Sequence, residues 1–185
     1  SNSSSKNSII IVADSPIINP KEIKPYPNLS VNYSVYLNTL LYSNWIEIFS
    51  GIKDQVEIFT LLNEKDMEYI PKYFLPDEAH TIIYNEPQLT NLSVYLHKRP
   101  QALNSKLLVL FYNSIGLNLK DFSRIFNLIQ TDEPSIVIGK SDHDKIILAC
   151  TYGLDGELVD PIITANRRYA DYLSLISAKD IFINT

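Results

Sequence analysis

Apolar and polar residues are arranged in blocks between Lys106 and Tyr152 that predict strand, loop, helix, strand, tight turn and strand. Two runs, Leu107 to Phe111 and Ile136 to Ile138, are continuously apolar, as expected of strands that are covered on both faces. Between them, five apolar residues recur at helical spacing: Leu119, Phe122, Ile125, Phe126 and Ile129. This order predicts a helix that packs on a sheet.

The start of this helix has a local signature. Asn118 is expected to cap the helix, with its side-chain oxygen accepting a hydrogen bond from the backbone N–H near Asp121. The Asp121 carboxylate favours the positive end of the helix dipole. Leu117 precedes the cap and Phe122 follows it in the first turn. An apolar pair at these positions fixes the angle at which the chain enters the helix.

The rest of the chain also alternates between strand and helix patterns. Strands are expected at Ile9 to Ala13, Val56 to Leu61, His80 to Tyr84 and the closing DIFIN. Helices are expected at Ser30 to Phe49, Glu64 to Tyr69, Asn91 to Leu103 and Ala165 to Ile176, with an irregular segment from Gly153 to Pro161. This alternation predicts a three-layer α/β fold in which the strands at Ile9 and Lys106 are central.

The first long helix has an expected core face. Its apolar residues Val35, Leu37, Leu40, Leu41 and Ile48 are expected to form one broad buried side. The prolines of the preceding segment, DSPIINPKEIKPYP, exclude a helix there and predict a loop.

Composition predicts one folded domain. The chain has 185 residues, of which 45% are hydrophobic and 20% are charged, and domains commonly span roughly 100–200 residues. Residues 9–185 are therefore expected to form a single domain. Residues 1–8, SNSSSKNS, are expected to be a disordered tail or a remnant of cloning.

Charge and cysteine usage limit the partners and the compartment. The formal net charge is -5 with no basic run, which gives no electrostatic reason to expect nucleic acid or an anionic membrane. No apolar run approaches the roughly 18 residues of a membrane span. The lone cysteine, Cys150, lies in an apolar run and cannot form an intrachain disulfide, which favours a reducing, cytoplasmic location.

Familiar catalytic motifs are missing from the sequence. It has no G-x-S-x-G, H-E-x-x-H, P-loop or G-x-G-x-x-G pattern, so no catalytic group is identified. The cluster Asp142, His143 and Asp144 is compatible with a metal or acid-base site, but such residues between two strands are typical of a solvated turn. Arg167 and Arg168 are adjacent, and a solvated helix face is expected for them.

Three segments together resemble a known family. VADSPIINPKEIKPYP, Ser114 to Leu117 and the turn GKSDHDKII are similar, in this order, to the motifs of bacterial GT-A-like glycosyltransferases, the nucleotide-diphospho-sugar transferases. The arginine of the family's first loop falls on Tyr26, and its metal-binding aspartate falls on Ser114. The paired glycines of its turn fall on Asp144 and Lys145. The resemblance implies a GT-A fold with a mostly parallel central sheet.

A site and two functions are expected. The expected substrate-binding residues are Asp14, Lys24, Asn113, Ser114 and Asp142, and a nucleotide-sugar is the ligand that the resemblance implies. Asp14 is a candidate catalytic or ribose-binding carboxylate because it follows the first strand, and ligands of α/β sheets bind outside the carboxyl ends of strands. An active GT-A enzyme would use Mg²⁺ or Mn²⁺, but neutral Asn113 and Ser114 suit these ions poorly. The metal and donor motifs are therefore degraded. The alternative is a non-catalytic binding or structural module on the same fold, with a protein partner.

Overall fold

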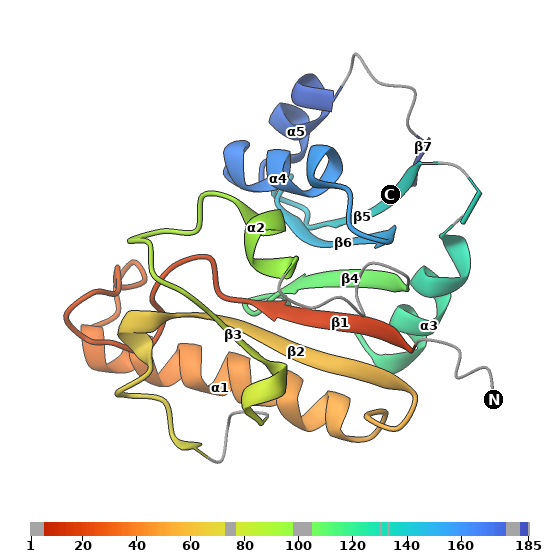
Figure 1. The fold of residues 1–185 in the computed structure, drawn as a ribbon. Coiled ribbons are helices and arrows are strands. Elements are labelled where there is room, and N and C mark those ends of the chain that lie inside the picture. The colour runs from red at the N-terminus through yellow and green to blue at the C-terminus, as the bar shows by residue number, and fades with distance from the viewer. Residues whose placement is uncertain are drawn as a thin grey trace.

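Strands of both directions make up the sheet of this protein. The computed structural model describes residues 6–72, 77–97, 105–129, 131–132, 134–176 and 182–184. Within these residues, seven strands form one sheet in the order β3-β2-β1-β4-β6-β5-β7 (Figure 1). They are β1 (Asn7–Val12), β2 (Val56–Asn63), β3 (Thr81–Tyr84), β4 (Lys106–Phe111), β5 (Ser135–Lys140), β6 (Ile146–Tyr152) and β7 (Phe182–Asn184).

The direction of one strand corrects the sequence-based prediction. β1 is parallel to β2 and β4, and β2 is parallel to β3, but β6 runs antiparallel to both β4 and β5. The sheet is therefore mixed rather than mostly parallel. The cause is the tight turn between β5 and β6, because a hairpin makes its two strands antiparallel.

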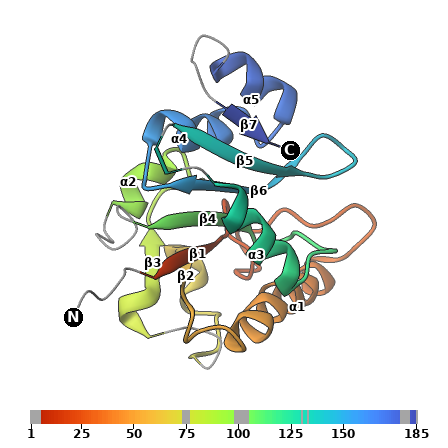
Figure 2. The same cartoon turned by 90° about the vertical axis from the view of Figure 1, so that its right-hand side faces the viewer.

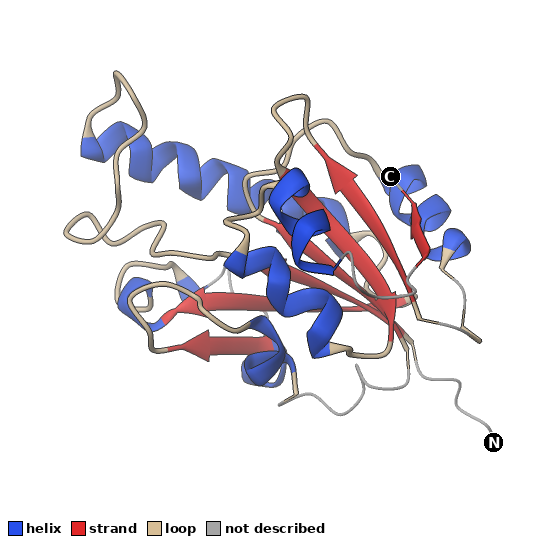
Figure 3. Cartoon of the chain, turned by 90° about the horizontal axis from the view of Figure 1, so that it is seen from above, coloured by secondary structure: helices blue, strands red, loops and turns tan. Residues whose placement is uncertain are grey.

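Helices cover both faces of the sheet (Figure 2). Side chains of α1 (Val31–Ser50) and α3 (Leu119–Leu128) belong to one hydrophobic cluster, and those of α2 (Leu92–Leu96), α4 (Gly156–Thr164) and α5 (Tyr169–Ile176) belong to another. The strands fan out between these layers in the view from above (Figure 3), as expected of a twisted sheet. The predicted α/β architecture, with β1 and β4 as interior strands, is confirmed.

Several elements differ in extent from their predictions. Glu64–Asp66 is a short 3₁₀ turn, and α2 ends at Leu96. Residues 98–103 of the expected helix lie outside the described residues. The segment expected to be irregular contains α4, with Pro161 inside it. Proline removes one hydrogen bond from a helix, and the burial of Leu158, Val159 and Ile162 offsets that loss.

The buried face of α1 is not the apolar face that its sequence predicts. The buried residues are Ser34, Asn38, Tyr42, Trp45 and Phe49, whereas Leu40 and Tyr36 are exposed. Its first turns pack beneath the loop that follows β1, where polar partners are needed. The prediction of the helix was right. That of its core face was right in part, because Val35, Leu41 and Ile48 pack half-buried against the core, whereas the most deeply buried side is the one given above.

Candidate functional site

Two of the expected site residues follow the carboxyl ends of neighbouring parallel strands. Val12 and Phe111 pair across β1 and β4, and Asp14 and Asn113 each stand two residues beyond this pair. Ligands of open α/β sheets bind outside the carboxyl ends of strands. Asp14 and Asn113 are therefore placed where such a site is expected.

A buried arginine joins these two residues. Arg167 donates from Nη1 to the Asp14 carboxylate at 3.4 Å and from Nη2 to Oδ1 of Asn113 at 3.2 Å. Its Nε donates to the Ile146 carbonyl at 3.1 Å, and the guanidinium lies 3.8 Å from the centroid of the Phe111 ring. The side chain is only 4% exposed. The expectation of a solvated face is wrong for Arg167 and right for Arg168, whose side chain is 69% exposed.

The backbone explains how Arg167 turns inward. The helix expected from Ala165 to Ile176 is interrupted, because Asn166 and Arg167 have φ angles of 52° and 62°. This left-handed conformation is uncommon for residues other than glycine and asparagine. It ends α4 and separates it from α5, and the Arg167 N–H and carbonyl then bond to Ile162 and Ile146. The asparagine at position 166 was the sequence signal for this turn, since asparagine favours helix ends of this kind.

The turn between β5 and β6 supports the same region. Asp144 also has a left-handed φ, 60°, at a position where the resembled family has glycine. Its carbonyl accepts from the Tyr169 N–H and its carboxylate from the Ala170 N–H. Asp142, in contrast, is exposed in this turn. Asp144 thus attaches the hairpin to the start of α5, next to Arg167.

Ser114 has a structural environment. It is 2% exposed, and its hydroxyl donates to the carbonyls of Phe111 and Ile147 at 2.8 and 3.1 Å. A hydroxyl with these partners fixes the chain after β4.

The loop after β1 is held by two buried polar side chains. The Asp66 carboxylate accepts from the backbone N–H groups of Ile17, Ile18 and Asn19 at 2.8 to 2.9 Å. Burial raises the pKa of Asp66, and these three hydrogen bonds oppose that shift. The Asn38 amide group donates to the Ile17 carbonyl at 2.7 Å. Sequence reasoning missed both residues.

Tyr26 also serves this loop. Its hydroxyl donates to the Asn38 side chain at 2.6 Å, so the position that carries arginine in the resembled family holds the loop against α1. Lys24, from the same loop, is exposed and lines an open cavity with Glu22 and Glu86.

Two cavities meet at the strand ends. One, of about 200 Å³, is lined by Asp14, Ser15, Gln88, Leu89, Lys145, Ile163, Asn166 and Arg167. The other, of about 820 Å³, contains Lys24 and shares Ser15 and Gln88 with the first. Asp14 and Lys24 therefore lie in neighbouring hollows of one cleft, whereas Asn113, Ser114 and Asp142 line neither of them.

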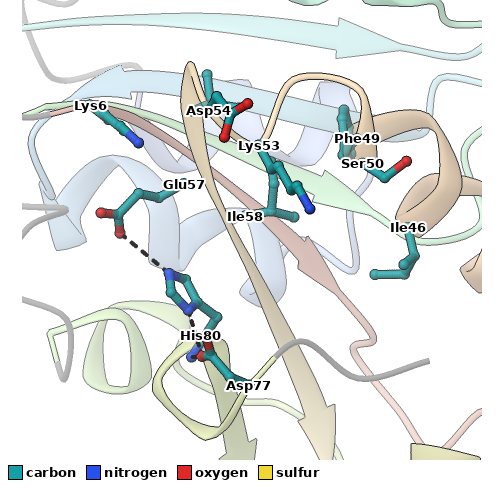
Figure 4. A pocket seen from close by; sticks show the side chains of 11 residues that line it. Lys6, Ile46, Phe49, Ser50, Lys53, Asp54, Glu57, Ile58, Asp77 and His80 are labelled. Atoms are coloured by element: carbon teal, nitrogen blue, oxygen red, sulfur yellow. Dashed lines mark hydrogen bonds and ion pairs between the residues drawn. The ribbon is translucent and has the colours of Figure 1, made fainter. Parts of the chain in front are cut away.

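A third cavity, of about 540 Å³, lies at the opposite ends of the strands. There His80 stands between Asp77 and Glu57, with Nδ1 2.6 Å and Nε2 3.7 Å from their carboxylates (Figure 4). Lys6 and Lys53 also line it, so its charges are mixed. The cleft at the carboxyl ends remains the better candidate, because ligands of α/β sheets bind there.

The oxygen atoms of the expected site residues at the strand ends do not suit a divalent cation. The carboxylate of Asp14 and the amide oxygen of Asn113 both accept from Arg167, and the Ser114 hydroxyl is buried against carbonyls. Across the described parts of the chain, no three His, Cys, Asp or Glu side chains form a group that could hold a metal. A cation would also be repelled by the fixed guanidinium.

The fold was compared with those of known proteins. No protein-family model matches the sequence, and a search of curated proteins finds no relative. A proposed nucleotide-diphospho-sugar transferase from Desulfovibrio desulfuricans G20 superposes with a TM-score of 0.69 at 8% identity, over 97% of this chain and 79% of that one. This chain shares the fold of that protein.

A second solved structure agrees with this fold. It is the homolog of Mycobacterium tuberculosis Rv0371c from Mycobacterium sp. strain JC1, with a TM-score of 0.53 at 10% identity over 97% of this chain and 84% of that one. The fold expected from the sequence motifs, that of the nucleotide-diphospho-sugar transferases, is confirmed by the similarity to the Desulfovibrio desulfuricans structure. Within the described residues, no helix is long and apolar enough to cross a membrane.

Proposed function

We propose that this protein is a GT-A-type domain that binds a nucleotide-linked sugar without a divalent cation and has lost metal-dependent sugar transfer. The observation that carries this proposal is the position of Arg167, whose guanidinium is fixed between Asp14 and Asn113 at the strand ends. A nucleotide-sugar brings a negatively charged diphosphate, and GT-A enzymes neutralise it with a cation. Arg167 supplies positive charge in the same cleft.

Electrostatics support this assignment. Burial lowers the pKa of Arg167 and the Asp14 carboxylate opposes the shift, but the ordinary pKa of arginine lies so far above neutral that the side chain stays charged at neutral pH. Lys145 lines the same cavity, and Lys24 lines the adjoining one. In this proposal Arg167 and Lys145 face the diphosphate and Lys24 lies in the adjoining hollow, while Asn113 orients the guanidinium.

The alternative function is a non-catalytic module that binds a protein partner. It is favoured by the fact that Asp14, Asn113 and Ser114 already have partners within the chain. Side chains satisfied in this way stabilise the fold without any ligand.

Calorimetric titration with UDP-, GDP- and CDP-sugars separates the two functions. Each titration is run with Mg²⁺ or Mn²⁺ and again with a chelator. We expect at least one nucleotide-sugar to bind with a dissociation constant near or below about 100 μM, roughly -5.5 kcal/mol, and with equal affinity in both buffers. Binding that disappears with the chelator would mean that a metal site exists. Absence of binding for every sugar nucleotide would favour the protein-binding module.

A further inference from the structure

The guanidinium of Arg167 keeps donors that no described residue uses. Nε donates to the Ile146 carbonyl, one N–H of Nη1 donates to Asp14, and one N–H of Nη2 donates to Asn113. Each terminal nitrogen of a guanidinium has two N–H groups, so one on Nη1 and one on Nη2 remain without a hydrogen bond to the described residues. Arginine commonly binds phosphate through two such N–H groups at once.

The contact with Asp14 is a weak one. It joins a single carboxylate oxygen to Nη1 at 3.4 Å, whereas charge-assisted hydrogen bonds of this type measure about 2.7–2.9 Å. The Asp14 side chain is 29% exposed, so water can solvate it if it leaves the guanidinium. Arg167 itself is fixed by the Ile146 carbonyl, Asn113 and the Phe111 ring, and these contacts do not depend on Asp14.

The cavity next to this pair has the charges for an anion. Its lining includes Arg167 and Lys145, opposed by the carboxylate of Asp14, and the Gln88 side chain adds polar groups. Its volume of about 200 Å³ is that of a small ligand group rather than of a whole nucleotide. The adjoining cavity with Lys24 provides further space.

We propose that this cavity binds a diphosphate on Arg167 and Lys145, and that the Asp14 carboxylate acts as an internal counter-anion which the ligand displaces. The inference rests on the proposed function, because a nucleotide-linked sugar would bring the diphosphate. Asp14 then lowers the affinity of the site for anions. It does not contact the ribose or the sugar.

Inorganic pyrophosphate, titrated in the presence of a chelator, tests this inference. Asp14→Asn keeps the size of the side chain and an oxygen for Nη1, but removes the competing charge. We expect it to tighten pyrophosphate binding about tenfold, since a like charge near the ligand opposes binding by about 1.4 kcal/mol or more. Glu47→Gln is the matched control, because it removes one carboxylate on the exposed side of α1 and should leave the affinity unchanged.

A second variant covers the case in which Asp14→Asn fails to fold. Lys145 is exposed, so Lys145→Gln should fold normally and weaken pyrophosphate binding about fivefold. Unchanged or weaker binding by Asp14→Asn, or no effect of Lys145→Gln, would overturn the inference.

Nucleotide-sugars in a parallel titration distinguish this inference from the proposed function. If pyrophosphate binds as described and no nucleotide-sugar binds, the anion site is correct and the proposed function is wrong. If nucleotide-sugars bind the wild type and Asp14→Asn weakens them, Asp14 contacts the ligand. The proposed function then stands and the counter-anion is refuted.

Discussion

Replacement of Arg167 by alanine is expected to lower the free energy of unfolding by about 3 kcal/mol. The change removes three hydrogen bonds and the contact with the Phe111 ring. It also leaves the Ile146 carbonyl without its side-chain donor in a buried position. Chemical denaturation followed by circular dichroism measures this loss.

The neighbouring arginine provides the control for this experiment. Arg168 has an exposed side chain and only a surface contact, 3.6 Å, with Asp171. Arg168→Ala should therefore change stability by less than about 0.5 kcal/mol. Equal effects of the two substitutions would contradict the structural role of Arg167.

Asp66→Asn is expected to have a comparable effect, about 3 kcal/mol. Oδ1 accepts from two backbone N–H groups and Oδ2 from a third. Asparagine offers one oxygen, so its NH₂ group would face at least one of these donors in a buried site. The loop that carries Asp14 and Lys24 would lose its attachment, and thermal unfolding should show the loss.

Limited proteolysis of the same variant gives a second readout. Cleavage between residues 14 and 29 should accelerate in Asp66→Asn relative to the wild type, because the loop opens locally. Glu64→Gln is the matched control, since Glu64 belongs to the same 3₁₀ turn but is exposed. If both variants are cut at the wild-type rate, Asp66 does not hold the loop.

The interior strands and α3 were predictable because their signals are local. The continuous apolar runs of β1 and β4 are typical of strands that are covered on both faces. The helix after Asn118 has the expected capping box, in which Asn118 and Asp121 bond each other's backbone. Such signals do not depend on the rest of the chain.

The order of the strands and the face of α1 depend on contacts distant in sequence. A hairpin signal between β5 and β6 does not specify which of its strands pairs with β4, so the antiparallel position of β6 was missed. On α1, Asn38 is buried because it bonds to Ile17 and Tyr26. Periodicity of apolar residues cannot predict a polar residue that is buried for this reason.

The candidate site was predictable only in part. The positions of Asp14 and Asn113 followed from the strand ends, but Arg167 comes from the turn between α4 and α5, far along the chain. Its role required a left-handed turn within a segment that has the pattern of a continuous helix. Tertiary packing, rather than a motif, creates the arrangement.

Direct measurement of Mn²⁺ binding tests the central claim that a guanidinium stands in place of the metal. Electron paramagnetic resonance of free Mn²⁺ is followed as the protein is added, with and without the tightest-binding nucleotide-sugar. We predict that the wild-type protein, at concentrations up to about 100 μM, removes no more free Mn²⁺ from solution than the nucleotide-sugar alone does. A metal site with a binding free energy of roughly -5.5 kcal/mol would be half-filled at that concentration. Stoichiometric Mn²⁺ uptake by the protein that Asp14→Asn abolishes would contradict this prediction.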